Sequence, residues 1–311
     1  MAAPIVYRWD DGNAPVARGE RRSLCDILYA CLVTGYGAKP GAGWTREYVN
    51  ATFDQAVFRN NPLTGTGFFI QIDGLGGGAA NTPIVRGYEV MTDSTITGAL
   101  GYIFGTTTAI SNATGTAARP WILIADDRAF YFTVFTTVTS GVPGISTANA
   151  NGIFFGDLIK ISPDDAYACG MAVSQYNTGY LATLYGPDAT TGQVWTTIYT
   201  PRRKNGSGSG GAGCLIRGGG PGGLTWPGQS GPAYDGQQLL YTRPHLNDNA
   251  AYTIRGFLPG FYYPCHPYTA FTQFQQLTAD GKTFLNIAHN VALGNGTTYG
   301  CYFISLDDWR A

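Results

Sequence analysis

Four pairs of adjacent aspartates are the first candidates for chemistry: Asp10-Asp11, Asp126-Asp127, Asp164-Asp165 and Asp307-Asp308. Hydrolysis of a glycosidic bond requires two carboxyl groups at a fixed separation, so these pairs are compatible with a glycan hydrolase. Adjacent aspartates are more typical of turns, because a short carboxylate accepts hydrogen bonds from nearby backbone N–H groups. We predict turns at all four pairs, keep hydrolysis as an alternative and assign no catalytic residue.

A metal site would require His or Cys ligands close together. The histidines His245, His266 and His289 lie near Cys265 and Cys301 in the C-terminal part of the sequence. Adjacent residues such as Cys265 and His266 point to opposite faces of a strand. The sequence also has no C-x-x-C or H-x-x-x-H pair, so we expect no metal site.

The cysteines follow neither a zinc pattern nor a dense disulfide pattern. There are six of them: Cys25, Cys31, Cys169, Cys214, Cys265 and Cys301. On one helix, Cys25 and Cys31 would be separated by about 9 Å, which is beyond disulfide reach. We expect all six to be reduced and most of them to be buried.

The glycine runs raise the question of nucleotide binding. Neither Gly74–Gly78 nor Gly218–Gly223 is part of a G-x-x-x-x-G-K-[ST] sequence, and no helical pattern follows the first run. Ser230 is one residue away from the position that a G-x-S-x-G elbow requires. The sequence therefore predicts no cofactor and no nucleophilic serine.

Aromatic residues are concentrated between positions 257 and 274. Exposed rings in such a segment could stack on sugars or contact a partner chain, whereas buried rings would form a small hydrophobic cluster under a loop. Both interpretations stay open. The residues assigned to a possible partner-contact loop are Phe257, Phe261, Tyr262, Tyr263, Tyr268 and Phe271.

The composition limits both partners and fold. The chain has 311 residues, a net charge of −1 and only 13% charged residues, so nothing favours nucleic acid or an anionic membrane. With 44 glycines and 14% aromatic residues, it has the composition of a turn-rich β protein. The first residues show no secretory signal and no segment has 18 consecutive apolar residues, so we expect a soluble product without membrane insertion.

One helix is predicted over residues 23–34. Leu24, Ile27, Leu28, Cys31 and Leu32 repeat at helical spacing. Ser23 is expected to be the N-cap, Asp26 lies in the first turn, and Gly35 can end the helix in the left-handed conformation.

After Gly35, short β-branched and aromatic runs alternate with turn residues, which predicts antiparallel sheets in a sandwich-like or layered arrangement with long Gly-rich loops. The clearest hairpin joins 121–125 to 128–135 through Asp126-Asp127. The expected strands are Ala56–Arg59, Phe68–Ile72, Ile84–Met91, Trp121–Ala125, Ala129–Val138, Gly152–Ile161, Ala166–Gln175, Tyr180–Tyr185, Val194–Tyr199, Gln237–Tyr241, Tyr252–Phe257, Thr283–His289 and Tyr299–Leu306.

Glycine makes up half of residues 204–223, which suggests a boundary between a main β domain, 1–203, and a C-terminal β subdomain, 224–311. The segment is interpreted as a loop or a linker. Cys214–Arg217 interrupts it and could add a short strand, so the two parts could also pack as one unit.

Several segments together carry a family resemblance. They are Pro4–Arg8, Ala14–Val16, Leu32–Pro40, Ala42–Thr45, Ala56–Arg59, Arg86–Met91, Arg119–Tyr131, Phe155–Asp157, Arg255–Phe261, Gly281–Leu285 and the closing Asp307-Asp308-Trp309. Through most of its length the chain resembles a family of tailed-bacteriophage virion structural proteins, and the resemblance is weakest between residues 200 and 235.

The resemblance implies a non-enzymatic protein of the virion, assembled in the host bacterial cytoplasm and placed on the head as a decoration, or on the neck, tail or baseplate. Its expected partners are copies of itself, as a symmetric oligomer, and other virion proteins, which could pair with free strand edges. The alternative is a tail-associated receptor or glycan-binding protein that contacts a host surface glycan.

Overall fold

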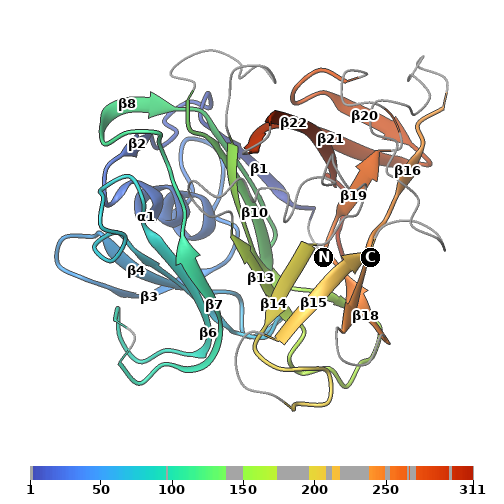
Figure 1. Cartoon of the computed structure of the whole chain (residues 1–311), viewed down its shortest axis with the longest axis horizontal. Helices are drawn as coiled ribbons and strands as arrows, with labels where there is room; N and C mark the ends of the chain where they lie inside the picture. Colours follow the sequence, from blue (N-terminus) through green and yellow to red (C-terminus); the bar gives the residue numbers. More distant parts are fainter. Residues whose placement is uncertain are drawn as a thin grey trace.

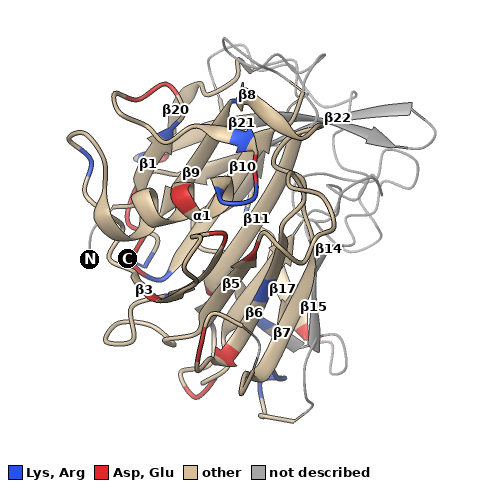
Figure 2. Cartoon of the chain, turned by 90° about the vertical axis from the view of Figure 1, so that its left-hand side faces the viewer, with Lys and Arg blue, Asp and Glu red and all other residues tan. Residues whose placement is uncertain are grey.

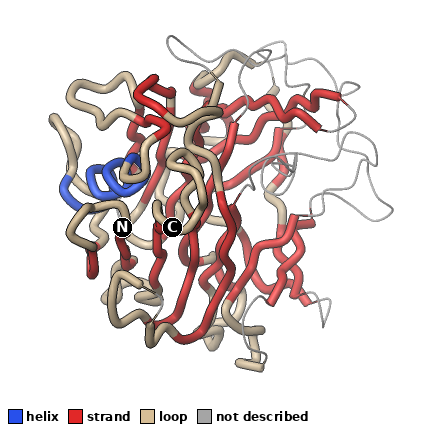
Figure 3. Tube along the Cα trace, turned by 60° about the vertical axis from the view of Figure 1, so that its left-hand side comes forward, coloured by secondary structure: helices blue, strands red, loops and turns tan. Residues whose placement is uncertain are grey.

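The computed structural model describes residues 3–95, 97–137, 150–173, 196–207, 212–217, 238–248, 253–264, 266, 271–293 and 296–310. Among the described residues, strands far outnumber the helical residues of one short segment, which confirms the mainly β prediction. Figure 3 shows the helical segment at one side of the molecule, next to the strands. In the described part of the chain, no helix has the length and apolar character needed to cross a membrane.

The largest sheet has ten strands, and every neighbouring pair in it is antiparallel. In spatial order they are β1 (Ile5–Arg8), β9 (Trp121–Ala125), β10 (Ala129–Phe135), β11 (Ala150–Asp157), β13 (Cys169–Val173), β14 (Thr196–Thr200), β15 (Ala212–Arg217), β17 (His245–Asp248), β18 (Thr253–Phe257) and β12 (Ile159–Lys160).

Each long face of this sheet is covered by a five-stranded sheet. The first is a meander of β3 (Thr45–Val49), β4 (Gln55–Arg59), β5 (Phe69–Asp73), β6 (Ile84–Val90) and β7 (Leu100–Thr107). The second has the order β16 (Tyr241–Thr242), β19 (Phe261–Pro264), β22 (Gly296–Ser305), β21 (Lys282–Leu293) and β20 (Gln276–Ala279). In Figure 1 the meander lies at the left, β10, β13, β14 and β15 of the ten-stranded sheet lie in the middle, and β16, β19, β20, β21 and β22 lie at the right.

Burial on both faces explains why the central strand β9 is apolar throughout. In β9, Trp121 and Leu123 belong to the core shared with the first five-stranded sheet, whereas Ile122 and Ile124 belong to the core shared with the second. Side chains alternate between the two faces of a strand, so a strand between two layers needs an apolar residue at every position.

The predicted helix is present as α1 (Ser23–Leu28), followed directly by one π-helical segment, Tyr29–Thr34. Its apolar side packs into the first core, and the small sheet of β2 (Ala17–Gly19) and β8 (Gly115–Arg119) lies beside it. Ser23 is not the N-cap: Arg22 occupies that position without a side-chain cap bond, and the Ser23 hydroxyl instead accepts the backbone N–H of Arg18 at 2.8 Å. Gly35 ends the helix with φ of 76°, as expected, but with ψ of 173°, outside the left-handed helical region.

The hairpin of β9 and β10 is confirmed, with Ala125 opposite Phe130. The sequence did not predict eight of the described strands: β1, β2, β3, β7, β8, β17, β19 and β20. The strand expected at Gln237–Tyr241 is instead only Tyr241–Thr242. The expected strand Tyr180–Tyr185 lies outside the described residues.

Strands from before and after the Gly-rich segment share the ten-stranded sheet. The segment Cys214–Arg217 lies within β15, which pairs with β14 on one side and with β17 on the other. Because β17 and β18 thereby join the same sheet as β1, the chain before residue 204 and the chain after residue 223 contribute to one sheet.

Candidate functional site

The aromatic segment that sequence analysis singled out lies mostly inside the molecule. Phe261, Tyr262, Tyr263 and Phe271 are buried, and Phe257 is half-buried. In the second five-stranded sheet, the ring of Phe261 stacks on Tyr302 with centroids 5.4 Å apart. A partner-contact loop made of these four side chains is therefore wrong, because packing within the chain already covers them. Tyr268 lies outside the described residues.

The paired aspartates serve turns, as predicted. One member of each pair accepts a nearby backbone N–H: Asp11 from Arg8, Asp126 from Arg128 and Ala129, Asp165 from Tyr167, and Asp308 from Arg310. Two of these pairs also take part in the polar network described below.

Histidine and cysteine also have local packing roles. The imidazole Nε2 of buried His266 accepts the backbone N–H of Leu240 at 2.8 Å. Cys25, Cys31 and Cys169 are free thiols in the interior. No group of three His, Cys, Asp or Glu side chains in the described ranges is arranged to hold a metal ion.

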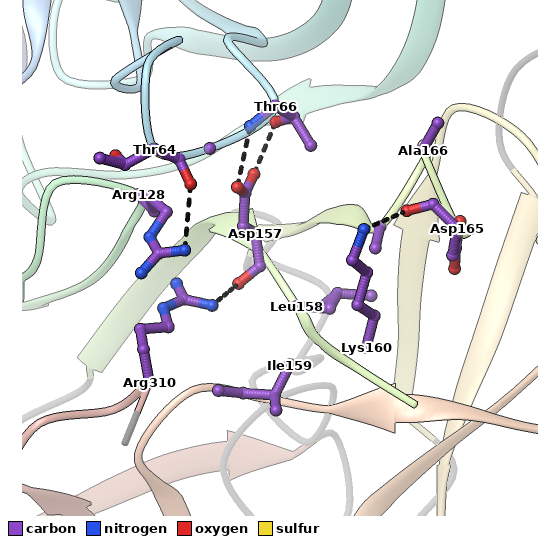
Figure 4. Close-up of a pocket in the computed structure, with 12 residues that line it drawn as sticks. Thr64, Thr66, Arg128, Asp157, Leu158, Ile159, Lys160, Asp165, Ala166 and Arg310 are labelled. Carbon is purple, nitrogen blue, oxygen red and sulfur yellow. Dashed lines mark hydrogen bonds between the residues drawn. The ribbon is translucent and has the colours of Figure 1, made fainter. Parts of the chain in front are cut away.

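A pocket of about 440 Å³ lies where the turn at 64–66, the start of β10, the segment 157–168 and the C-terminal end of the chain meet. Figure 4 shows Arg128 and Arg310 on one side of Asp157, and Lys160 and Asp165 on the other. Ile159, Ala166 and Ala168 supply apolar wall. The pocket thus combines hydrogen-bonding groups with a partly apolar lining.

Asp157, at the end of β11, is one of the two buried acids that line the pocket. Its carboxylate accepts hydrogen bonds from the Thr66 backbone N–H at 2.9 Å, the Thr66 hydroxyl at 2.6 Å and the Asn60 side chain at 2.9 Å. Burial nevertheless raises the pKa of Asp157 above its ordinary value, although these donors and the nearby Arg310 act in the opposite direction. Saturation by three donors makes this carboxylate a structural anchor for the 64–66 turn.

Arg310 binds both the turn after β9 and the end of β11. Its Nε donates to Asp126 Oδ2 at 3.0 Å and its Nη1 donates to the backbone carbonyl of Asp157 at 3.0 Å. The side chain is only 7% exposed, and Nη2 is buried without a hydrogen-bond partner among the described residues. Such an unsatisfied donor costs about 1–3 kcal/mol.

Arg128 and Lys160 complete the polar lining. Arg128 Nη1 donates to the Thr64 carbonyl at 3.0 Å, and the Thr64 hydroxyl donates to Asp127. Lys160 Nζ donates to the carbonyl of Pro163 at 2.7 Å. Both cations therefore hold loops in place around the opening.

The charges of the pocket nearly cancel. Arg128, Lys160 and Arg310 line it together with Asp157 and Asp165. Asp126 pairs with Arg310, Asp127 with Arg128, and Arg255 with Asp165, which brings the region to four cations and four carboxylates. A region with this balance suits a neutral polar ligand better than a strongly charged one.

The pocket brings together segments that sequence analysis quoted separately. Arg128 comes from Arg119–Tyr131, Asp157 from Phe155–Asp157, and Arg255 from Arg255–Phe261, while Arg310 directly follows the closing Asp-Asp-Trp. Asn60, Thr66 and Arg310 were missed, since a single polar residue carries no periodic or motif signal.

No protein-family model matches this chain, and no curated protein matches it significantly.

Proposed function

We propose that the protein is a non-enzymatic structural component of a tailed-phage virion, which assembles as a symmetric oligomer on the capsid exterior or on the tail, neck or baseplate. The observation that carries the proposal concerns the polar residues in the segments that resemble virion proteins. These residues form hydrogen bonds and ion pairs between distant parts of the chain. Arg310 bonds to Asp126, directly after β9, and to the backbone of Asp157 in β11. Arg255 of β18 forms a buried ion pair with Asp165. A structural subunit needs such internal contacts because it has to keep its shape under mechanical force.

The test is quantitative mass spectrometry of purified virions, with the copies of this chain counted relative to the major capsid protein. Hundreds of copies are expected for a decoration protein, and a small number set by a ring is expected for the neck or the baseplate. Absence of the chain from purified particles would overturn the proposal.

A second candidate is binding of a host surface glycan. The specific observation in its favour is the pocket around Arg310, whose donors, carboxylates and apolar wall match the mixed surface of a saccharide. Its test is ligand-observed NMR with the purified protein and a panel of monosaccharides from the host envelope. Saturation transfer from the protein to one sugar supports glycan binding if it is lost in a Thr64→Tyr variant, whose larger side chain narrows the opening. The absence of transfer to any sugar rules glycan binding out.

A further inference from the structure

Three Asn-Gly pairs occur in the sequence: Asn151-Gly152, Asn205-Gly206 and Asn295-Gly296. In such a pair the backbone nitrogen of the glycine can attack the side-chain amide carbon of the asparagine, because glycine has no Cβ to hinder the approach. Asn295 lies outside the described residues. The structure describes both residues of the other two pairs, and their surroundings differ.

Asn205 and Gly206 lie in a turn between β14 and β15. The Gly206 N–H donates to the Arg203 carbonyl at 2.9 Å, and the Arg203 N–H donates to the Ser207 carbonyl at 3.1 Å. Asn205 and Ser207 are exposed, and Gly206 is half-buried. Water therefore reaches the Asn205 amide, and the backbone at this position can rotate without opening a sheet.

Two donors act on the side-chain oxygen of Asn205. The Ser207 N–H donates to Asn205 Oδ1 at 3.0 Å, and the Ser207 hydroxyl donates to the same oxygen at 2.6 Å. Negative charge develops on this oxygen when a nitrogen attacks the amide carbon, and donors aimed at such an oxygen stabilise that charge. The turn therefore favours attack at the Asn205 amide.

Positive charge precedes the asparagine in the same turn. Arg202 pairs with Glu89 of β6 at 2.8 Å, while Arg203 and Lys204 are exposed. Attack requires the Gly206 nitrogen to lose its proton, and neighbouring cations favour the resulting negative charge, although solvent and salt screen the effect. The charge around the turn thus acts in the same direction as the Ser207 donors.

The Asn151-Gly152 pair is instead held in the central sheet. In β11, Asn151 lies opposite Val134 of β10 and Gly152 lies opposite Thr133. Figure 2 shows β10 and β11 side by side in this sheet. The Asn151 side-chain amide also donates to the Ala109 carbonyl at 2.8 Å. Attack at Asn151 requires a backbone rotation that separates the two strands, so only locally opened molecules can react.

We propose that Asn205 is a site of spontaneous deamidation in the folded protein, promoted by Ser207. The Gly206 nitrogen loses its proton to a solvent base and forms a bond to Asn205 Cγ. The bond from Cγ to Nδ2 breaks, and Nδ2 takes a proton from solvent and leaves as ammonia. Water then opens the five-membered succinimide at either carbonyl and gives aspartate or isoaspartate. The net reaction consumes one water, releases one ammonia and involves no oxidation or reduction.

The modification changes the charge and the backbone of the turn, and it is independent of the proposed function. It adds one negative charge beside Arg203 and Lys204 in a chain whose net charge is −1. An aspartate at position 205 can accept the same hydrogen bonds from Ser207. An isoaspartate adds a methylene group to the main chain and is expected to displace Ser207 from the turn.

The experiment incubates the purified full chain in mildly alkaline buffer and follows the peptides that contain residues 151 and 205 by mass spectrometry. An isoaspartyl methyltransferase detects the isoaspartate product. Conversion at Asn205 is expected to be at least about tenfold faster than at Asn151, because β11 has to open before Asn151 reacts. A native Asn205 that keeps its amide, or that converts no faster than Asn151, would overturn the inference.

The same incubation in urea separates the effect of structure from that of sequence. Both asparagines precede a glycine, so their rates are expected to converge once the chain is unfolded. A difference that persists in urea would show that the fold is not its cause and would also overturn the inference.

Variants of Ser207 test the donors. Ser207→Ala should slow conversion at Asn205 several-fold and leave Asn151 unchanged, because the hydroxyl donor is lost. Ser207→Thr is the matched control, since it keeps a hydroxyl and should retain the wild-type rate. A Ser207→Ala protein that converts as fast as the wild type would overturn the role assigned to Ser207.

Discussion

Arg255 and Asp165 lie 90 residues apart in the sequence and form a bidentate ion pair with 1% and 0% of their side chains exposed. The two bonds measure 2.7 and 3.1 Å. Arg255 also donates to the Thr200 hydroxyl and to the carbonyls of Arg202 and Tyr167, so all five guanidinium N–H groups are used. The pair joins β18 to the loop before β13 and the end of β14.

Removing one partner of this pair should lower the free energy of unfolding far more than removing both partners. Arg255→Met leaves the Asp165 charge buried and unpaired, which should lower the free energy of unfolding by about 3–5 kcal/mol. The double variant Arg255→Met/Asp165→Leu should lose less. Urea unfolding measures both, with Arg22→Met as the control, because the exposed pair of Arg22 and Asp26 is expected to contribute about 0.3–0.5 kcal/mol. Equal losses in Arg255→Met and the control would contradict this account.

Asp73 should contribute to stability in a pH-dependent way. Burial alone raises its pKa, but hydrogen bonds from Gln55, Arg86 and the Gly76 N–H outweigh burial and hold the pKa below its ordinary value. The unfolded chain therefore binds the proton more readily, and the stabilisation present above the unfolded pKa of about 3.9 is lost as pH falls through the lower folded value. Unfolding free energies of the wild type and Asp73→Asn should converge below about pH 4. A constant gap from neutral to acid pH would count against this explanation.

Gly156 should not tolerate a side chain. Its φ is 140°, and a Cβ there would lie 2.3 Å from both Ala129 Cα and the Arg128 carbonyl oxygen. Gly156→Ala should destabilise the protein by at least about 2 kcal/mol, through backbone strain and separation of β10 from β11. Thermal unfolding can measure the loss. Gly12→Ala is the control, since a Cβ at Gly12 meets nothing within 4 Å, and comparable effects of the two substitutions would show the reasoning to be wrong.

Phe261 should behave as a core residue. Its side chain is fully buried between Tyr131, Tyr263 and Tyr302. Phe261→Ala should cost about 3–5 kcal/mol in denaturant unfolding. Phe53→Ala, at a ring that is 41% exposed, should cost about 1 kcal/mol or less. A small loss at Phe261 would restore the hypothesis of a contact loop.

Three thiols should resist alkylation in the native protein. Burial raises the pKa of Cys25, Cys31 and Cys169, so little thiolate is present and access is poor. Peptide mapping after a short iodoacetamide treatment should find these three unmodified in the native state and modified in urea. Rapid native labelling of any one of them would contradict its placement in the core.

Local chemistry was enough to predict some elements. The helix over 23–34 follows from apolar residues that recur at helical spacing in each turn. The hairpin of β9 and β10 follows from two apolar runs on either side of an acidic turn. Strands β3 and β7 escaped prediction because their exposed faces mix polar, apolar and glycine residues, so neither shows a clean alternation. Those strands are specified by their partners in the meander.

The sequence by itself determined the β class, the turns at the aspartate pairs and the position of the helix, because each depends on residues within a few positions of one another. The burial of Phe261 and Tyr263, the contribution of residues 212–217 to the central sheet, and the pocket were decided by the tertiary structure alone. Arg310 meets Asp126 across 184 positions and Thr66 meets Asp157 across 91. Contacts at such separations exist only after the sheets have stacked, since the free energy that orders these side chains comes from the packed layers around them.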